Sequence, residues 1–235
     1  MEHQKTISNS VKVNGINVYN GNKNYIIFHP AEQNSGRVFY YKGEKIKATL
    51  ENAVHKRKGI VLKGNKKNIG LVEHMLSSVH VLGLDNLVME LKDGVCPTTN
   101  NCAQEYFLKL KNKVYEQNLS KEFWKYSFDN PVEITRPESP DKIKVFPSKN
   151  FTLEYYFNYP HIPLKDKNVF FNGDPKIYEK EISNSRPPGF LGNFSKPFLF
   201  LGKLGLHGIN CRNYLIVGNK KMENFFNPKK FGVSK

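Results

Sequence analysis

The sequence predicts an α+β fold made of two similar small domains, each a sheet packed against helices. Short runs of alternating apolar and polar residues, bounded by Asn-Gly and Ser-Gly turns, predict strands in both halves of the chain. A helical pattern follows the strands in each half. The chain has 235 residues, which is enough for two small domains with an ample core.

The first half carries four predicted strands and two predicted helices. Apolar residues between Val72 and Val79 recur at the i, i+3, i+4 and i+7 spacing of an amphipathic helix. A second helix is predicted over residues 103–114, where Phe107 and Leu110 supply apolar side chains. These elements form a complete unit, so we predict a first domain over residues 1–114. The predicted strands of this domain are residues 11–18, 25–29, 38–41 and 87–91.

The second half begins with another series of strands. The polar segment 115–125 is predicted to be a linker, and a helical pattern covers residues 175–183. Because the second half begins like the first, we predict a second domain over residues 126–235. Its predicted strands are residues 132–135, 143–146, 151–156, 169–171 and 214–217.

Composition excludes several classes of protein. A chain with 39% hydrophobic and 13% aromatic residues is typical of globular rather than disordered proteins. No apolar run approaches the roughly 20 residues that a membrane-spanning helix needs, so we expect no transmembrane segment. The N-terminal residues show no signal peptide and no recognisable targeting peptide. The three cysteines form no Cys-x-x-Cys pair, which favours a reducing, intracellular compartment.

The net charge of +15 is concentrated in two basic blocks, residues 42–67 and 186–235. Such blocks favour a polyanionic partner, with RNA first and anionic lipid second. The alternative is a coding bias toward lysine, which would scatter lysines onto solvated faces and which explains the total charge well but the clustering less well. The candidate nucleic-acid or partner contacts are Lys56, Arg57, Lys58, Lys63, Lys66, Lys67, Lys220, Lys221, Lys229 and Lys230.

Residues 71–86 are the most informative segment. The pair Glu73-His74 opens the predicted helix, and Gly83-Leu84-Asp85-Asn86 lies between that helix and the next strand. This arrangement resembles the metal and base segment of the zinc-dependent UDP-3-O-acyl-N-acetylglucosamine deacetylases of lipid A synthesis. The resemblance implies that His74 corresponds to a zinc ligand and Glu73 to a general base. Further similar segments span nearly the whole chain, at Gly15–Gly21, His29–Phe39, Pro97–Ala103, Ser183–Phe190 and Asn213–Val217.

The sequence also departs from the family pattern. The family's other two zinc ligands stand as His-x-x-x-Asp, a spacing that places both on one face of a helix. No histidine of this chain has an acidic residue four positions later, and the late Gly-His-x-x-x-Asn segment is absent. Pro187 stands where the family has a threonine. Relative to the family, we therefore expect an incomplete second domain.

These departures predict a loss of catalysis. Catalytic zinc needs about three protein ligands and a water, so His74 alone is expected to remain unoccupied and Glu73 to be an inactive remnant. We therefore expect no cofactor. The sequence predicts a pseudoenzyme that is a structural subunit of a large assembly, with other protein subunits covering the second domain. The basic blocks favour a ribonucleoprotein such as an organellar ribosome, in the mitochondrial matrix or another organelle.

Two alternatives remain open. The first is a zinc-dependent UDP-3-O-acyl-N-acetylglucosamine deacetylase, either divergent or split so that a second chain supplies the missing ligands. The second is a lipid- or nucleotide-sugar-binding module that keeps the pocket without the chemistry.

Overall fold

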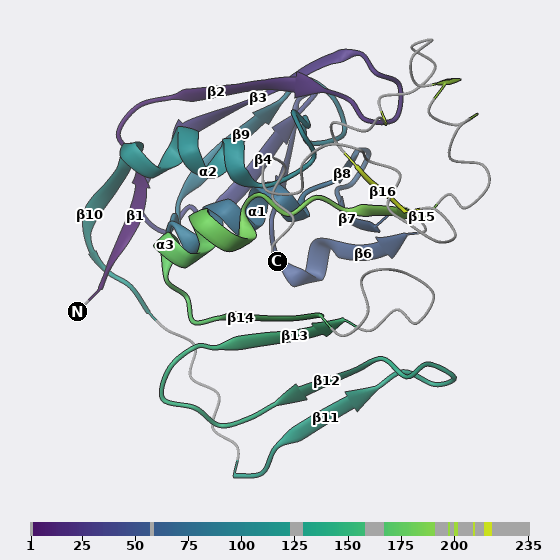
Figure 1. The fold of residues 1–235 in the computed structure, drawn as a ribbon. Helices are drawn as coiled ribbons and strands as arrows, with labels where there is room; N and C mark the ends of the chain where they lie inside the picture. The colour runs from purple at the N-terminus through teal and green to yellow at the C-terminus, as the bar shows by residue number, and fades with distance from the viewer. Residues whose placement is uncertain are drawn as a thin grey trace.

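The computed structural model describes residues 2–56, 59–122, 129–157, 167–190, 197, 200–201, 209 and 214–217. The mixture of sheets and helices confirms the predicted α+β class (Figure 1). The first half contains β1 (His3–Ile7), β2 (Val11–Ile16), β3 (Lys23–Pro30), β4 (Arg37–Tyr41), β5 (Glu44–Lys47), η1 (Leu50–Asn52), β6 (Ala53–Lys56), β7 (Gly59–Lys63), β8 (Asn68–Gly70), α1 (Glu73–Val81), β9 (Leu87–Leu91), α2 (Gln104–Leu110), η2 (Lys111–Lys113) and β10 (Val114–Ser120). The second half contains β11 (Val132–Thr135), β12 (Lys142–Val145), β13 (Leu153–Phe157), β14 (Lys167–Phe171), α3 (Pro175–Ile177), the π-helical turn η3 (Tyr178–Ile182), β15 (Pro188–Phe190) and β16 (Leu215–Val217).

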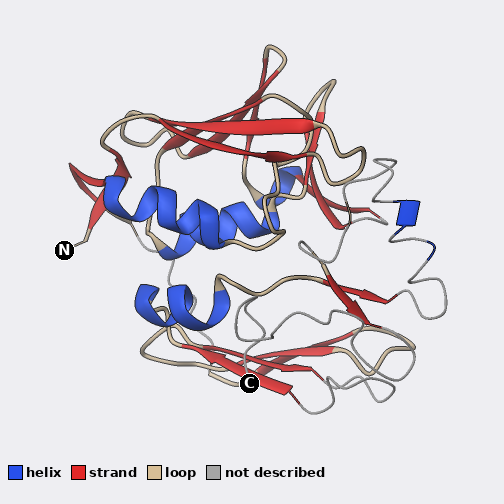
Figure 2. Ribbon diagram, turned by 45° about the horizontal axis from the view of Figure 1, so that its top comes forward, coloured by secondary structure: helices blue, strands red, loops and turns tan. Residues whose placement is uncertain are grey.

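The main sheet of the first half has the strand order β2-β3-β9-β4-β5. Neighbouring strands are antiparallel except β4 and β9, which are parallel. Helices α1 and α2 cover one face of this sheet (Figure 2). Alternation along the strands directs Phe28, Phe39 and Met89 to that face, where they are fully buried with Met75 of α1. Burying each such side chain contributes about 1.5–3 kcal/mol, so this layer is the core of the first half.

Residues 115–120, which were expected to begin the linker, instead form most of strand β10. This strand pairs with β1 in an antiparallel ladder. Its pattern is difficult to recognise in the sequence because the one buried side chain of β10 is the polar Gln117. Gln117 is held by hydrogen bonds rather than by apolar packing: its Nε2 donates to the Ala31 carbonyl at 3.0 Å. The division into domains 1–114 and 126–235 stays a prediction.

The two halves meet through their helices. The helical segment α3–η3 lies between α1 and α2 on one side and the strands of the second half on the other (Figure 2). Phe107 of α2 packs against Tyr178, which also contacts Phe171. An ion pair of 2.6 Å joins Lys111 Nζ to Glu179 Oε1. Both apolar packing and charge pairing therefore hold the second half against the helices of the first.

Strands β11 to β14 form two antiparallel hairpins, β11–β12 and β13–β14. Several of their apolar side chains are open to solvent, including Ile134 (58% exposed), Ile143 (63%) and Tyr156 (61%). A partner that covers these strands stays a prediction, and so does the proposed duplication of the domains. No helix in the described part of the chain is long and apolar enough to cross a membrane.

Replacing Tyr178 by Phe is expected to lower the free energy of unfolding by about 1 kcal/mol. The Tyr178 hydroxyl, in a side chain that is 3% exposed, shares a hydrogen bond of 2.6 Å with Ser77 Oγ across the contact between the halves. Urea unfolding of the variant and the parent measures this loss. The same change at the exposed Tyr115 is the control, and an equal loss at both positions would contradict the interpretation.

Candidate functional site

The Glu73-His74 pair lies at the start of α1, immediately after a sharp reversal of the chain. Strand β8 ends at Gly70, and Leu71 has a left-handed φ of +56°. A bulky residue rarely adopts that conformation, and strained backbone of this kind is frequent at functional sites. Val72, the next residue, is buried in the core. Its packing holds this reversal of the chain in place. Glu73 then enters the first turn of α1, where the helix dipole favours a negative charge.

The Glu73 carboxylate is held by the neighbouring sheet of β6, β7 and β8. Its Oε1 accepts a hydrogen bond of 2.9 Å from the backbone N–H of Ile60 in β7. Toward the start of β7, the last residue that pairs with β8 is Val61, which lies opposite Gly70. Ile60 is the next residue and has no partner in β8. The carboxylate therefore occupies the position that the next β8 residue would take. Glu73 Oε2 has no hydrogen bond to a residue in the described part of the chain.

The His74 imidazole is in the form that can bind a metal ion. Burial lowers its pKa below the ordinary value, and the adjacent Glu73 carboxylate raises it by a smaller amount. The ring is therefore neutral at neutral pH and has a nitrogen lone pair. Within the described residues, the ring has no hydrogen-bond partner. His74 thus fits the role of a metal ligand.

Two tyrosines from different halves of the chain lie near Glu73. Burial raises the pKa of Tyr19, and the charges of Tyr214 and Glu73 raise it further. The pKa of Tyr214 is raised mainly by burial and also by the Glu73 charge, while a hydrogen bond with the Asn101 side chain opposes this shift. Both phenols therefore keep their protons at neutral pH and can donate hydrogen bonds. The structure brings these residues together with Glu73, and sequence reasoning did not include either tyrosine in the site.

The loop that carries Asn101 is seated against strand β2. Asn101 is buried with a left-handed φ of +57°, and its Oδ1 accepts a hydrogen bond of 3.2 Å from Thr98 Oγ1. Ile16 and Thr98 exchange backbone hydrogen bonds of 2.8 and 2.9 Å. A Cβ at Gly15 would lie 2.6 Å from the Thr98 carbonyl oxygen, so only glycine permits this approach. The loop in turn holds Tyr214 beside Glu73.

The described residues do not complete a metal site around His74. Within the described ranges, no three His, Cys, Asp or Glu side chains are grouped so that they could hold a metal ion. Catalytic zinc needs about three protein ligands, and His74 is one candidate. The described residues therefore supply one candidate zinc ligand, His74.

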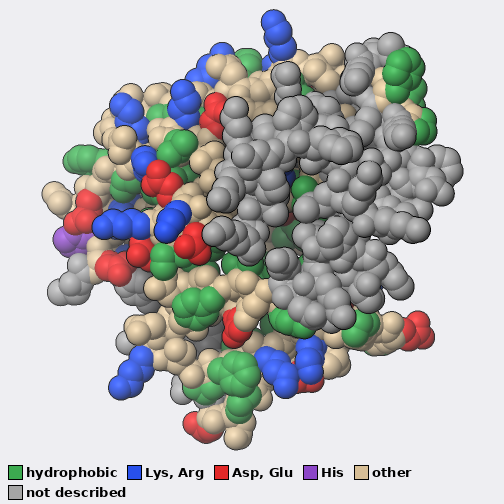
Figure 3. Space-filling view, viewed as in Figure 1, with side chains coloured by type: hydrophobic (Ala, Val, Ile, Leu, Met, Phe, Trp, Pro, Cys, Tyr) green, Lys and Arg blue, Asp and Glu red, His purple; other side chains and the backbone are tan. Residues whose placement is uncertain are grey.

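Four of the predicted basic contacts lie on the three-stranded sheet β6-β7-β8, and all four are exposed. Lys56 ends β6 at one end of the sheet, whereas Lys63, Lys66 and Lys67 lie at the other end, about 13 Å along β7. Lysine and arginine side chains on the face in Figure 3 are interspersed with acidic ones. The predicted contacts Arg57, Lys58, Lys220, Lys221, Lys229 and Lys230 lie outside the described residues.

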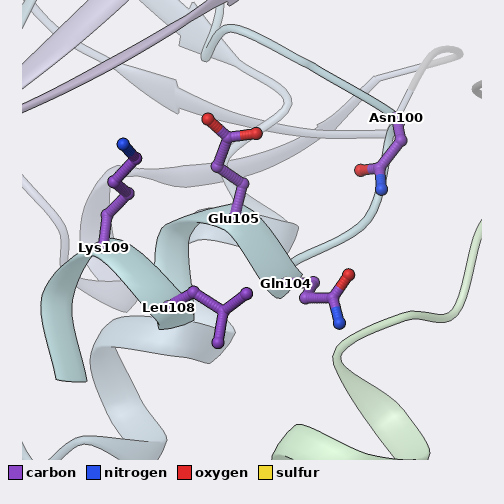
Figure 4. A pocket seen from close by; sticks show the side chains of 5 residues that line it. All are labelled: Asn100, Gln104, Glu105, Leu108 and Lys109. Carbon is purple, nitrogen blue, oxygen red and sulfur yellow. The ribbon is translucent and has the colours of Figure 1, made fainter.

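A cavity of about 220 Å³ lies beside α2 (Figure 4). No residue of the Glu73-His74 site contributes to its wall, so it does not indicate where a substrate would meet Glu73. The residues that line it are Asn100, Gln104, Glu105, Leu108 and Lys109.

The stability of the metal-free protein is expected to fall as the pH decreases below the ordinary histidine value of 6.5. Because the folded-state pKa of His74 is lowered, the unfolded state binds the proton more readily. The stability contributed by the neutral ring is present above the unfolded pKa and is lost as the pH falls through the folded pKa. Urea unfolding at pH values of about 7.5 and 5.5 measures this loss. His74→Gln should reduce the pH dependence, and an unchanged dependence in this variant would contradict the assignment.

Comparison with known proteins gives a consistent result across the chain. A family model described as UDP-3-O-acyl N-acetylglycosamine deacetylase matches residues 4–229. The UDP-3-O-acyl-N-acetylglucosamine deacetylase of Wigglesworthia glossinidia brevipalpis is 28% identical, over 95% of this chain and 76% of the relative. The protein of the same name from Blochmanniella floridana is 29% identical, over 83% of this chain and 67% of the relative. That of a Nitratiruptor species is 27% identical, over 94% and 73% respectively.

These similarities show that the predicted structural subunit of a ribonucleoprotein is wrong. The relatives that match most of the chain are named as deacetylases, and neither they nor the structure support a ribosomal role, an inactive enzyme or a mitochondrial location. The error arose from charge, because an excess of lysine raises the potential around a protein whether or not a polyanion binds it.

Proposed function

This chain belongs to the UDP-3-O-acyl N-acetylglycosamine deacetylase family of hydrolases, and we propose that it is a zinc-dependent deacetylase of lipid A biosynthesis. The substrate would be a UDP-3-O-acyl-N-acetylglucosamine, from which water removes the acetyl group. One observation carries the proposal. At the start of α1, the Glu73 carboxylate, which accepts the Ile60 N–H, is adjacent to a neutral His74 ring that has no hydrogen bond to a described residue. A base and a metal ligand in adjacent positions can act on the same water molecule once further ligands complete the metal site.

Glu73 acts as the general base. Its Oε2 accepts a proton from the attacking water, while Oε1 keeps the hydrogen bond from Ile60. As the carbonyl carbon–nitrogen bond breaks, the same proton passes from Glu73 to the leaving nitrogen. Acetic acid and the free amine of the sugar are the products, the acid loses its proton to solvent as acetate, and Glu73 returns to its carboxylate form.

His74 would hold zinc through one ring nitrogen. The chemistry that zinc would supply there is polarisation of the acetyl carbonyl and a lower pKa of the attacking water. About two further protein ligands would be needed to complete the zinc site. Tyr19 and Tyr214, whose phenols stay protonated, lie beside Glu73 in this site.

The test is a deacetylation assay with UDP-3-O-acyl-N-acetylglucosamine and the full chain supplied with zinc. Mass spectrometry of the product should show loss of one acetyl group, and a chelator should stop the reaction. Zinc content should fall in the His74→Ala variant, and activity should fall with it. Binding of the UDP-sugar without hydrolysis would instead favour a nucleotide-sugar-binding module, and absence of both binding and hydrolysis would overturn the proposal.

A further inference from the structure

The three-stranded sheet of β6, β7 and β8 is attached to the rest of the molecule by a glutamate at each end. Glu73 lies at the end where β7 begins, and Glu44 of β5 lies at the β7–β8 turn. Both carboxylates come from outside the sheet and accept backbone N–H groups from it. The sheet therefore links the main sheet of the first half to the candidate base.

Glu44 fixes the β7–β8 turn through three successive backbone donors. Its Oε2 accepts a hydrogen bond of 3.0 Å from Lys67 N, and Lys66 N lies 3.3 Å from both carboxylate oxygens. Its Oε1 accepts the backbone N–H of Asn65. A Cβ at Gly64 would lie 2.5 Å from Glu44 Oε1 and 2.7 Å from Ile46 Cδ1, so a larger residue there would displace these two side chains. Charge-assisted hydrogen bonds of this kind are about twice as strong as neutral ones.

At the other end, the Glu73 carboxylate lies close to the start of β7. The hydrogen bond from Ile60 N to Glu73 Oε1 measures 2.9 Å. Gly59 has a φ of +117°, and a Cβ there would lie 2.9 Å from the same Glu73 oxygen. An exposed glutamate usually samples several rotamers, whereas this one is held at one oxygen by a strand. The second oxygen, Oε2, remains available for a proton.

We propose that the backbone N–H of Ile60 is a positioning group for the Glu73 carboxylate, and that Glu44 holds the sheet that presents this N–H. The inference rests on the proposed function, because it takes Glu73 as the base of the reaction. A base released from its tether would spend less time in the reactive position. Misplacement of a reacting group by about 1 Å can reduce the rate roughly 100-fold.

The test replaces Ile60 by Pro, which removes the donor, and by Val, which keeps it. Ile60→Pro should lower kcat by about 10- to 100-fold, with little change in KM, whereas Ile60→Val should behave as the parent. A parallel fall in both variants, or no fall in Ile60→Pro, would overturn the proposal. Glu44→Ala should shift kcat in the same direction as Ile60→Pro, since it releases the far end of the sheet.

A second pair of variants covers the case in which Ile60→Pro does not fold. Gly59→Ala adds a Cβ against Glu73, while Gly43→Ala adds one at another left-handed glycine that has no neighbour within 4 Å. Both changes strain the backbone, but only Gly59→Ala should lower kcat through Glu73. Equal activities of the two variants would count against the tether.

Amide hydrogen exchange separates the tether from the proposed function. The Ile60 amide should exchange at least about 10-fold faster in Glu73→Ala than in the parent, because its acceptor is gone. Unchanged exchange would refute the tether whether or not the protein is an active enzyme. A parent chain with no deacetylase activity but with faster exchange in Glu73→Ala would refute the proposed function and leave the tether established.

Discussion

Replacing Glu73 by Gln is expected to lower the deacetylation rate by about 10²- to 10⁴-fold, the usual contribution of a general base. Gln has nearly the same shape as Glu, and its side-chain oxygen can still accept the Ile60 N–H. It has no carboxylate to take a proton from water, so the chemical step should fail while the fold persists. The comparison of kcat for the parent and Glu73→Gln, at equal zinc content, measures the effect.

The matched control is Glu32→Gln, which makes the same substitution at an exposed glutamate of the β3–β4 connection. This variant should keep the activity of the parent. Retention of more than about one tenth of the activity in Glu73→Gln would remove Glu73 from the role of general base. Loss of zinc from Glu73→Gln would show instead that the change disturbs His74, and this is why zinc content is measured alongside the rate.

The sequence predicted the centre of the candidate site but not its surroundings. Glu73 and His74 are adjacent in the chain and begin a helix with a clear apolar period, so a local pattern was sufficient to identify them. Tyr214 lies beside Glu73 only because Asn101 and the second half bring it there. Tyr19 lies within the segment Gly15–Gly21 that resembles the family, yet its approach to Glu73 depends on the folded β2–β3 connection. The spacing of apolar residues within one segment does not show which distant segment it will contact.

The same limit applies to the fold. Strand β9 (Leu87–Leu91) was predicted with correct bounds because its alternate side chains are buried against helices. Strands β6, β7 and β8 were not predicted, since most of their side chains are exposed or half-buried. Leu62 and Ile69 are the two side chains of these strands that are buried in the core, and the Glu44 and Glu73 carboxylates hold the two ends of the sheet. One buried apolar residue in β7 and one in β8 are too few to give a hydrophobic period that predicts the strands.

The wrong functional prediction has a related cause. Inactivity was inferred from motifs that the sequence lacks, and the ribonucleoprotein from its total charge. Membership of the deacetylase family rests on residues 4–229, which are present. Positive matches over most of a chain carry more information than missing motifs, because a ligand can be supplied by residues that a short motif does not cover.

Replacing Asn86 by Ala is expected to lower the free energy of unfolding by about 2–4 kcal/mol, because it removes the centre of a buried polar network. Asn86 Nδ2 donates to Gln117 Oε1 at 2.7 Å and to Gln4 Oε1 at 2.8 Å, and its Oδ1 accepts Gly36 N at 2.9 Å. These bonds connect the segment before β9 to β1, β10 and the turn before β4. Urea unfolding of the variant and the parent measures the loss.

Asn118→Ala is the control, because Asn118 lies on β10 next to Gln117 but points to solvent, and it should change stability by less than about 0.5 kcal/mol. A comparably small loss for Asn86→Ala would mean that water replaces the Asn86 amide in the network.

The expected large loss would explain why the Gly83–Asn86 turn follows the helix of the Glu73-His74 pair. The Asp85 carboxylate accepts the backbone N–H of Lys5 at 3.0 Å, so this turn fixes β1 to the end of α1. The part of the family motif that follows Glu73 and His74 would then serve stability, while the pair itself would serve chemistry.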